Sequence, residues 1–321
     1  MNLTGIHVFK GVDEKSYSEH ILLIQLISAM AWKKNGPIHL YTTKKDYRFF
    51  RAMGIHKIYD HIDTEVLEQE DEIYWPHFGA ASKMKVLNSI QQFPVAFIDN
   101  DLIYPEQLDE SIFDYDITFL HDEGRFWRNY PKLELLGTRP DYQFPNIPEL
   151  QTCNPINVGF FIMNNKELKE RYCELAIDYM NKNEGLSSRV KWADKDLRKF
   201  WKPLFVEQRL LSAVVDNGKY TKNQLFPYQY YGDTCNWESK ITGERITSKE
   251  LFKKENFKWF HLWGEKVAYK KPEFQSLKII MFYNLLNKIF KSGDPIAISA
   301  AHGVIKWLRT SNPNSEYKIW K

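Results

Sequence analysis

The feature that most constrains the fold of this chain is an alternation of short apolar segments with longer segments of helical character. Such alternation is typical of parallel strands joined by crossover helices. The sequence therefore predicts an α/β fold with a mixed, mainly parallel sheet flanked by helices. The strands are expected at residues 5–9, 38–42, 55–59, 95–98, 116–120 and 154–164, and the helices at 16–34, 44–53, 79–92, 166–183 and 205–216.

Composition narrows the class of protein. Of the 321 residues, 43% are hydrophobic, which is enough for one large core with or without a smaller appendage. The 44 basic residues nearly balance the 41 acidic ones, so the net charge of +3 does not favour a nucleic-acid partner. Three cysteines, Cys153, Cys173 and Cys235, include no Cys-x-x-Cys pair, which argues against a disulfide framework or a zinc ribbon. A reducing, cytoplasmic setting is expected.

The amino-terminal region has none of the features of a secretory signal peptide. The most apolar early run, residues 21–32, is interrupted by Gln25 and Ser28 and is too short to cross a bilayer. We therefore expect no membrane-spanning segment.

An apolar run at residues 95–98 leads directly into Asp99-Asn100-Asp101. Residues i and i+2 of an extended strand point to the same side, so Asp99 and Asp101 are expected to present their carboxylates to one point. Two carboxylates at one point favour a hard divalent cation, Mn²⁺ or Mg²⁺, which a diphosphate could also coordinate. The alternative is a solvated junction between a strand and a loop.

Three later motifs carry polar groups at the ends of expected elements. Asn157 and Gly159 lie in the polar first part of the strand at 154–164. They could contact a ligand there, and the alternative is a glycine at a strand bulge. Glu207 and Gln208 begin a helix, where an acid serves either the helix dipole or catalysis. The third motif follows an aromatic run and consists of His261, Gly264 and Lys266.

The order of these motifs resembles the metal-dependent GT-A glycosyltransferases, especially those of glycosyltransferase family 8. The resemblance covers residues 1–270, which are expected to form a Rossmann-like transferase domain. It implies an enzyme that moves a sugar from a nucleotide-sugar donor, expected to be a UDP-sugar, to a glycan or lipid-linked acceptor. It also implies that the metal ligands are Asp99, Asp101 and His261.

The same resemblance assigns roles to the remaining motif residues. Lys266 is expected to contact the donor diphosphate, and Asn157 and Gly159 the donor sugar, with Asn100 and Gly264 also at the donor. Glu207 and Gln208 occupy the place of acceptor or anomeric-centre residues, so Glu207, Gln208 and Asn157 are the expected catalytic groups. The His261 motif resembles retaining enzymes.

Two further features bear on the site. Lys83, on the helix at 79–92, is a second candidate for a phosphate or nucleotide contact, with a solvated lysine as the alternative. The acidic segment His121-Asp122-Glu123 is expected to be a solvated turn, and one of its groups could otherwise act as the base of an inverting reaction. The proline-rich stretch 126–155 is expected to be a long loop.

The carboxyl-terminal residues 271–321 are expected to form a helical extension, with helices at 273–291 and 296–309. Packing on the rest of the fold is the expected role of these helices. Peripheral contact with an anionic membrane is the alternative, and it would suit a lipid-linked acceptor.

Three other functions compete with the transferase. The segment 95–101 is also similar to the first motif of haloacid-dehalogenase phosphatases, in which the first Asp is a nucleophile. The 10 Trp and 18 Tyr residues would suit a non-catalytic carbohydrate- or nucleotide-binding protein, although core packing accounts for aromatic residues spread along a chain. An inactive scaffold with the same fold is the third.

Overall fold

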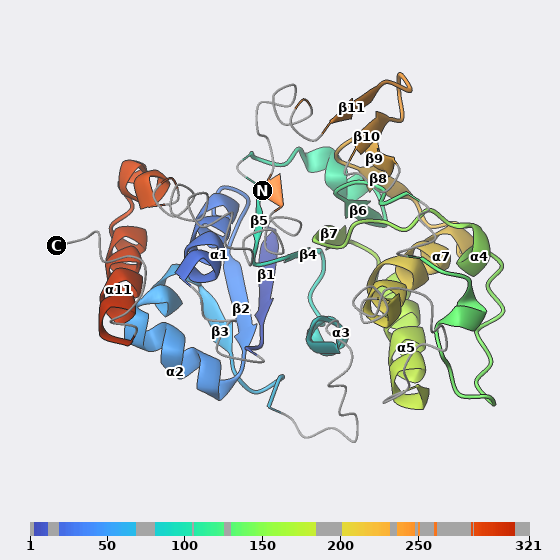
Figure 1. Cartoon of the computed structure of the whole chain (residues 1–321), viewed down its shortest axis with the longest axis horizontal. Helices are drawn as coiled ribbons and strands as arrows, with labels where there is room; N and C mark the ends of the chain where they lie inside the picture. Colours follow the sequence, from blue (N-terminus) through green and yellow to red (C-terminus); the bar gives the residue numbers. More distant parts are fainter. Residues whose placement is uncertain are drawn as a thin grey trace, which may run out of the picture. The chain divides into compact units, whose positions relative to one another are not determined.

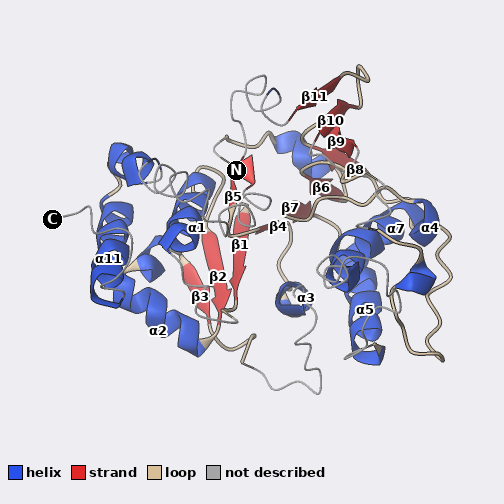
Figure 2. Cartoon of the chain, in the orientation of Figure 1, coloured by secondary structure: helices blue, strands red, loops and turns tan. Residues whose placement is uncertain are grey.

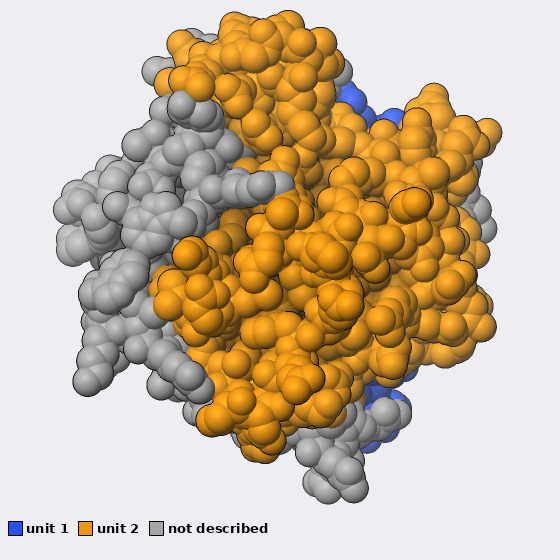
Figure 3. All heavy atoms as spheres, turned by 90° about the vertical axis from the view of Figure 1, so that its right-hand side faces the viewer, with its two compact units in different colours: residues 1–68, 98–108, 258–321 blue, residues 69–97, 109–257 orange. Residues whose placement is uncertain are grey.

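The computed structural model divides the chain into two compact units (Figure 3). Unit 1 comprises residues 1–68, 98–108 and 258–321, and unit 2 comprises residues 69–97 and 109–257. The structure describes residues 3–11, 19–68, 81–104, 106–124, 130–183, 201–231, 236–247, 250, 260–261, 284 and 286–311.

The main sheet has seven strands in the order β3-β2-β1-β4-β7-β6-β8 (Figures 1 and 2). The pairs β1–β2, β2–β3 and β6–β8 are parallel, and β6–β7 is antiparallel. The expected mixed, mainly parallel α/β sheet is therefore confirmed. Its strands are β1 (Thr4–Phe9), β2 (Ile38–Thr42), β3 (His61–Asp63), β4 (Val95–Ile98), β6 (Ile117–Phe119), β7 (Phe160–Met163) and β8 (Lys222–Gln224).

In unit 1, β1, β2 and β3 are accompanied by α1 (Glu19–Trp32), α2 (Lys44–Met53) and α11 (Pro295–Ser311) (Figure 1). Local sequence explains the bounds of α2, which were predicted correctly. The Thr43 side chain accepts a hydrogen bond from the Asp46 N–H at the start of the helix. Gly54 ends it in the left-handed region at φ 77°, with its N–H bonded to the Arg51 and Phe50 carbonyls.

The third strand was predicted in the wrong place. Residues Ile55–Ile58 form a 3₁₀ turn, η2, and the strand begins only at His61. Ile55 and Ile58 are both fully buried. A 3₁₀ turn puts residues i and i+3 on the same side, so both isoleucines can enter the core without an extended backbone.

Unit 2 carries β6, β7 and β8 of the main sheet, and its helices pack on one another, α3 on α5, and α4 and α5 on α7. A small antiparallel sheet of β9 (Tyr228–Tyr231), β10 (Asn236–Ser239) and β11 (Arg245–Thr247) belongs to the same unit. The expected loop at 126–155 is interrupted by two short helices where it is described. The helical elements of unit 2 whose bounds the structure describes are α3 (Ala81–Ser89), η3 (Glu110–Asp114), η4 (Leu133–Leu135), α4 (Glu149–Thr152), α5 (Lys166–Lys182), η5 (Phe205–Arg209) and α7 (Leu210–Asn217).

The carboxyl-terminal helix α11 packs on α1, α2 and η2 within unit 1. Its residues Ala297, Ala300, Ala301 and Val304 are fully buried, so the described part of this segment packs as expected. The expected boundary between residues 270 and 271 lies outside the described residues. No helix in the part of the chain that the structure describes is long and apolar enough to span a membrane.

Candidate active site

The acidic pair lies in a turn at the end of β4. The strand ends at Ile98, and the Leu102 N–H donates to the Asp99 carbonyl oxygen at 2.9 Å, a bond from residue i+3 to residue i that closes a β-turn. The expectation that Asp99 and Asp101 lie on one side of an extended strand is therefore wrong. A four-residue turn, rather than strand periodicity, holds the two carboxylates in one short segment. Asp101 is 7% exposed, whereas Asp99 and Asn100 are half-buried, so this turn is only partly open to solvent.

Asn100, between the two acids, ties the turn to β1. Its Nδ2 donates to the Val8 carbonyl at 2.7 Å, within unit 1. Its Oδ1 is buried and accepts no hydrogen bond from the described residues. The turn thus gathers two carboxylates and an unsatisfied amide oxygen, and oxygen donors of this kind fit Mn²⁺ or Mg²⁺.

Strand pairing places the backbone of His261 beside the acidic turn of unit 1. The two-residue strands β5 (Leu102–Ile103) and β12 (Phe260–His261) are antiparallel, with His261 opposite Leu102. The backbone of His261 therefore lies one register position from Asp101. The described side chains contain no group of three or more His, Cys, Asp or Glu that could hold a metal. The side chain of His261 and residues Gly264 and Lys266 lie outside the described residues.

In unit 2, Asn157 and Gly159 lie in the loop that enters β7. The Asn157 Oδ1 accepts from the Gly159 N–H at 2.9 Å, and its Nδ2 donates to Glu123. The Asn157 N–H also donates to the His121 carbonyl at 2.8 Å. These bonds fix the orientation of the Asn157 amide, whose exposure is only 4%.

The segment His121-Asp122-Glu123 is not the solvated turn that was expected. His121 is fully buried and Asp122 is 4% exposed. The Asp122 carboxylate accepts a hydrogen bond from Lys240, and burial raises the pKa of the Glu123 carboxyl to about 7. The Glu123–Asn157 contact could not be predicted from local sequence, because it joins the ends of two strands that are distant in the chain.

Lys83 and Glu207 form an ion pair within unit 2. The Lys83 Nζ lies 3.5 Å from the Glu207 Oε1, and their side chains are 13% and 19% exposed. Lys83 also donates to the Val158 carbonyl at 3.2 Å, next to Asn157. The structure therefore brings Lys83 and Glu207 together beside the loop that carries Asn157, and it excludes a fully solvated lysine.

Glu207 and Gln208 lie in a π-helical turn, η5, instead of the regular α-helix that was predicted. The Gln208 Oε1 accepts a hydrogen bond from the Tyr130 hydroxyl, and Arg209, 6% exposed, donates to the Leu150 and Pro131 carbonyls. Tyr130 was not among the predicted site residues. Single π turns within helices occur frequently at functional sites.

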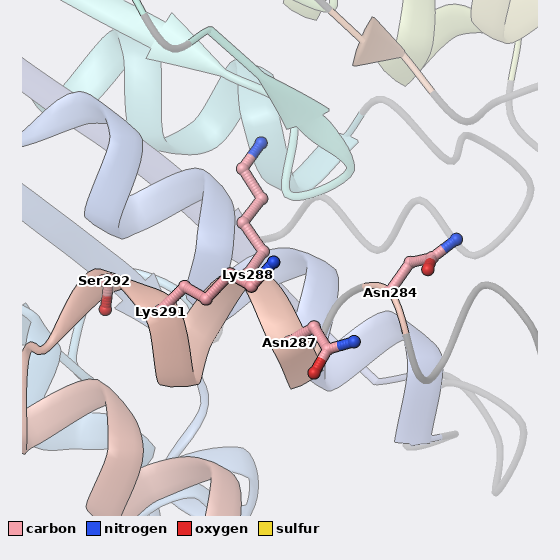
Figure 4. A pocket seen from close by; sticks show the side chains of 5 residues that line it. All are labelled: Asn284, Asn287, Lys288, Lys291 and Ser292. Carbon is pink, nitrogen blue, oxygen red and sulfur yellow. The ribbon is translucent and has the colours of Figure 1, made fainter.

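Two hollows lined by described residues contain none of the predicted site residues. One, of about 490 Å³ in unit 2, has Glu167, Glu170 and Arg171 in its lining. The other, of about 530 Å³ in unit 1, is shown in Figure 4 and is lined by Asn284, Asn287, Lys288, Lys291 and Ser292. Burial lowers the pKa of Lys288.

Comparisons with known proteins found structural likenesses only. No family model and no curated protein sequence matches the chain. The chain is similar to an active-site mutant of LgtC, with 13% identity and a TM-score of 0.33 over 61% of this chain and 68% of that chain. The PaToxG glycosyltransferase is 11% identical, with a TM-score of 0.36 over 67% and 68% of the two chains.

A nucleoside-diphosphate-sugar pyrophosphorylase from Vibrio cholerae RC9 is 8% identical, with a TM-score of 0.37 over 68% of this chain and 90% of that chain. Glycosyltransferases are thus among the solved structures that resemble the chain.

Proposed function

We propose that the chain is a metal-dependent glycosyltransferase that moves a sugar from a nucleotide-sugar donor to a glycan or lipid-linked acceptor. The observation that carries this proposal is the pairing of β12 with β5. It sets the backbone of His261 opposite Leu102, directly beside the acidic turn, although the two segments are far apart in the chain. Two carboxylates and an imidazole are a suitable ligand set for Mn²⁺.

The proposed metal ligands are Asp99, Asp101 and His261. A bound Mn²⁺ or Mg²⁺ supplies electrostatic stabilisation of the charge that develops on the departing nucleoside diphosphate. Lys266 is proposed to donate a hydrogen bond to the same diphosphate, which is expected to be uridine-based, and Asn100 and Gly264 to line the donor.

The proposed sugar and acceptor groups belong to unit 2. The Asn157 amide and the backbone at Gly159 are assigned to the donor sugar, and Glu207 and Gln208 to the positive charge that develops at the anomeric carbon. Lys83 holds the Glu207 carboxylate at 3.5 Å, and Tyr130 donates to Gln208. Both groups are therefore held in place by neighbours, which is what a preorganised site requires.

We propose a retaining reaction, in which the departing phosphate oxygen takes the proton of the acceptor hydroxyl. Glu123, the acid that could serve as an inverting base, already accepts a hydrogen bond from Asn157. Comparing the anomeric linkage of product and donor by NMR tests this assignment, and an inverted centre contradicts it.

The test of the proposed function is calorimetric titration of UDP into the chain with Mn²⁺ and then with a chelator. Tight binding is expected only with the metal, and Asp101→Asn should abolish the metal-dependent part. The matched control is Asp60→Asn, because Asp60 accepts from the Ile38 N–H at 2.8 Å, a contact within unit 1 that does not involve the acidic turn. Equal affinity with and without metal would refute the proposed metal site.

Turnover distinguishes the transferase from its competitors. A screen of nucleotide sugars with Mn²⁺, read as release of the nucleoside diphosphate, should find one preferred donor. Metal and nucleotide binding without turnover of any donor would favour an inactive scaffold instead. The phosphatase alternative has less support, because β1, β2 and β3 all precede β4, whereas the phosphatase motif normally opens its domain.

A further inference from the structure

Four buried side chains of unit 1 form an unbroken chain of hydrogen bonds that ends on the acidic turn. Gln25 and Ser28 lie on α1, His7 lies on β1, and Tyr59 follows η2. The Gln25 Nε2 donates to the Tyr59 hydroxyl at 2.9 Å, and that hydroxyl lies 3.0 Å from the His7 Nδ1. The His7 Nε2 lies 3.1 Å from the Ser28 Oγ, which donates to the Leu102 carbonyl.

We call this chain of hydrogen bonds the relay. The groups at its two ends determine which atom donates and which accepts in each bond. The Leu102 carbonyl can only accept, so the Ser28 hydroxyl proton is committed to it, and the Ser28 oxygen must then accept from the His7 Nε2–H. At the other end the Gln25 amide nitrogen can only donate, which leaves the Tyr59 proton for the His7 Nδ1. Both ends therefore require the same neutral His7 tautomer, with its proton on Nε2.

Burial keeps the relay neutral. His7 and Gln25 are fully buried, Ser28 is 2% exposed and Tyr59 is 7% exposed. Burial lowers the pKa of His7 to about 3, although the nearby Asp99 acts in the opposite direction. A second proton on His7 would also leave the Tyr59 hydroxyl without an acceptor.

The relay ends at Leu102, which lies between the acidic turn and the strand pair that carries His261. The Leu102 N–H closes the turn on Asp99, and the Leu102 carbonyl accepts from Ser28. Leu102 also follows Asp101 directly and is the residue opposite His261. Both backbone polar groups of Leu102 are therefore held, which fixes the two peptide planes on either side of this residue.

We propose that Gln25, Tyr59, His7 and Ser28 are positioning residues that set the geometry of the cation site through the Leu102 carbonyl. This inference rests on the proposed function, since it takes the acidic turn to be a metal site. Groups that hold the ligands of a metal commonly tune its affinity, and a buried hydrogen-bond network favours one arrangement of its ends.

The primary test measures Mn²⁺ affinity of the full chain by electron paramagnetic resonance of the free ion. Ser28→Ala removes the hydrogen bond to the Leu102 carbonyl and should weaken Mn²⁺ binding about tenfold, as the loss of groups that hold metal ligands commonly does. Ser28→Thr, which keeps a hydroxyl, should recover most of the affinity. Tyr59→Phe removes the middle of the relay, and a smaller loss is expected.

The matched control is Asn35→Ala. Asn35 is also fully buried in unit 1, and it also holds the segment 98–108, but away from the turn. Its Oδ1 accepts from the Leu108 N–H at 2.8 Å, and its Nδ2 donates to the Glu106 carbonyl at 3.2 Å. This variant should lose thermal stability as Ser28→Ala does, while its Mn²⁺ affinity stays unchanged.

A second readout does not depend on metal. The ¹⁵N spectrum of the His7 ring in the wild-type chain should show a neutral imidazole protonated on Nε2 across the pH range in which the chain is folded. Tyr59→Phe should release Nδ1 and populate the second tautomer. A wild-type His7 that carries its proton on Nδ1 would overturn the relay itself.

The outcomes separate the two proposals. If Ser28→Ala binds Mn²⁺ as tightly as the wild type, or if Asn35→Ala weakens binding equally, the positioning role fails and the proposed function stands. If the wild-type chain binds no Mn²⁺, the proposed function and the positioning role fail together.

Discussion

Burial sets the protonation of Glu123, the acid that contacts Asn157. Desolvation raises the pKa of its carboxyl to about 7, the hydrogen bond from Asn157 lowers it, and the negative charge of Asp122 raises it further. The usual value for this group is 4.5. Between these two values the folded protein holds a proton on Glu123 that the unfolded chain has released.

This difference predicts a stability that depends on pH. The contribution of neutral Glu123 is fully present below pH 4.5 and is lost as the pH rises through about 7. Glu123→Gln keeps an acceptor for Asn157 but cannot ionise. Its stability relative to the wild type should therefore rise between pH 4.5 and 7 and then level off. Urea unfolding at a series of pH values measures this.

Glu134→Gln is the control for Glu123→Gln, because Glu134 is exposed, and its stability difference from the wild type should be flat over the same range. A flat difference for Glu123→Gln as well would show that Glu123 ionises normally in the folded protein.

At the scale of elements, α11 approaches α2 closely through a glycine. A Cβ added at Gly303 would lie 2.0 Å from the Met53 carbonyl oxygen, and the neighbouring Val304 is fully buried. The obstacle is backbone at the end of α2, which cannot move aside as a flexible side chain can. Gly303 is therefore needed for the contact between the two helices.

Gly303→Ala should destabilise the protein by about 1–3 kcal/mol, the usual cost of overpacking, despite the better helix propensity of alanine. Ser299→Ala is the control, because Ser299 lies on the same helix and is exposed. It should change the free energy of unfolding by less than about 0.5 kcal/mol. Chemical denaturation measures both, and a stabilised Gly303→Ala variant would argue against the close helix contact.

For the whole molecule, the C-terminal helix α11 is counted with residues 1–68 in unit 1. Deletion of residues 295–321 should expose the faces of α1, α2 and η2 that α11 covers. We expect the melting temperature to fall by about 10 °C, the order that a loss of roughly 3 kcal/mol produces in a domain of this size.

The same truncation tests the alternative of a membrane contact. Sedimentation with anionic vesicles should show no difference between the full chain and the truncated one, beyond what unfolding causes. An unchanged melting temperature together with lost vesicle binding would instead assign the C-terminal segment to a membrane surface.

Several elements could be predicted from the sequence because their signals are local. The bounds of α2 follow from a capping threonine and a terminal glycine, and α5 begins after Asn165, whose side chain accepts from the Leu168 N–H. The buried strand β4 and its acidic end follow from an unbroken apolar run. Each of these elements depends on residues within one turn or one strand, where backbone sterics and nearby hydrogen bonds determine the local conformation.

Tertiary structure alone decided the pairings between distant segments. Nothing near His261 specifies that its backbone lies opposite Leu102, and nothing near Lys83 specifies Glu207 as its partner. The 3₁₀ turn at Ile55–Ile58 buries both isoleucines, and Asn100 ties the turn at Asp99 to the Val8 carbonyl, a contact between segments far apart in the chain. Apolar runs and paired acids specify which groups must be buried or brought together. The groups that these residues contact depend on how the whole chain packs around its core.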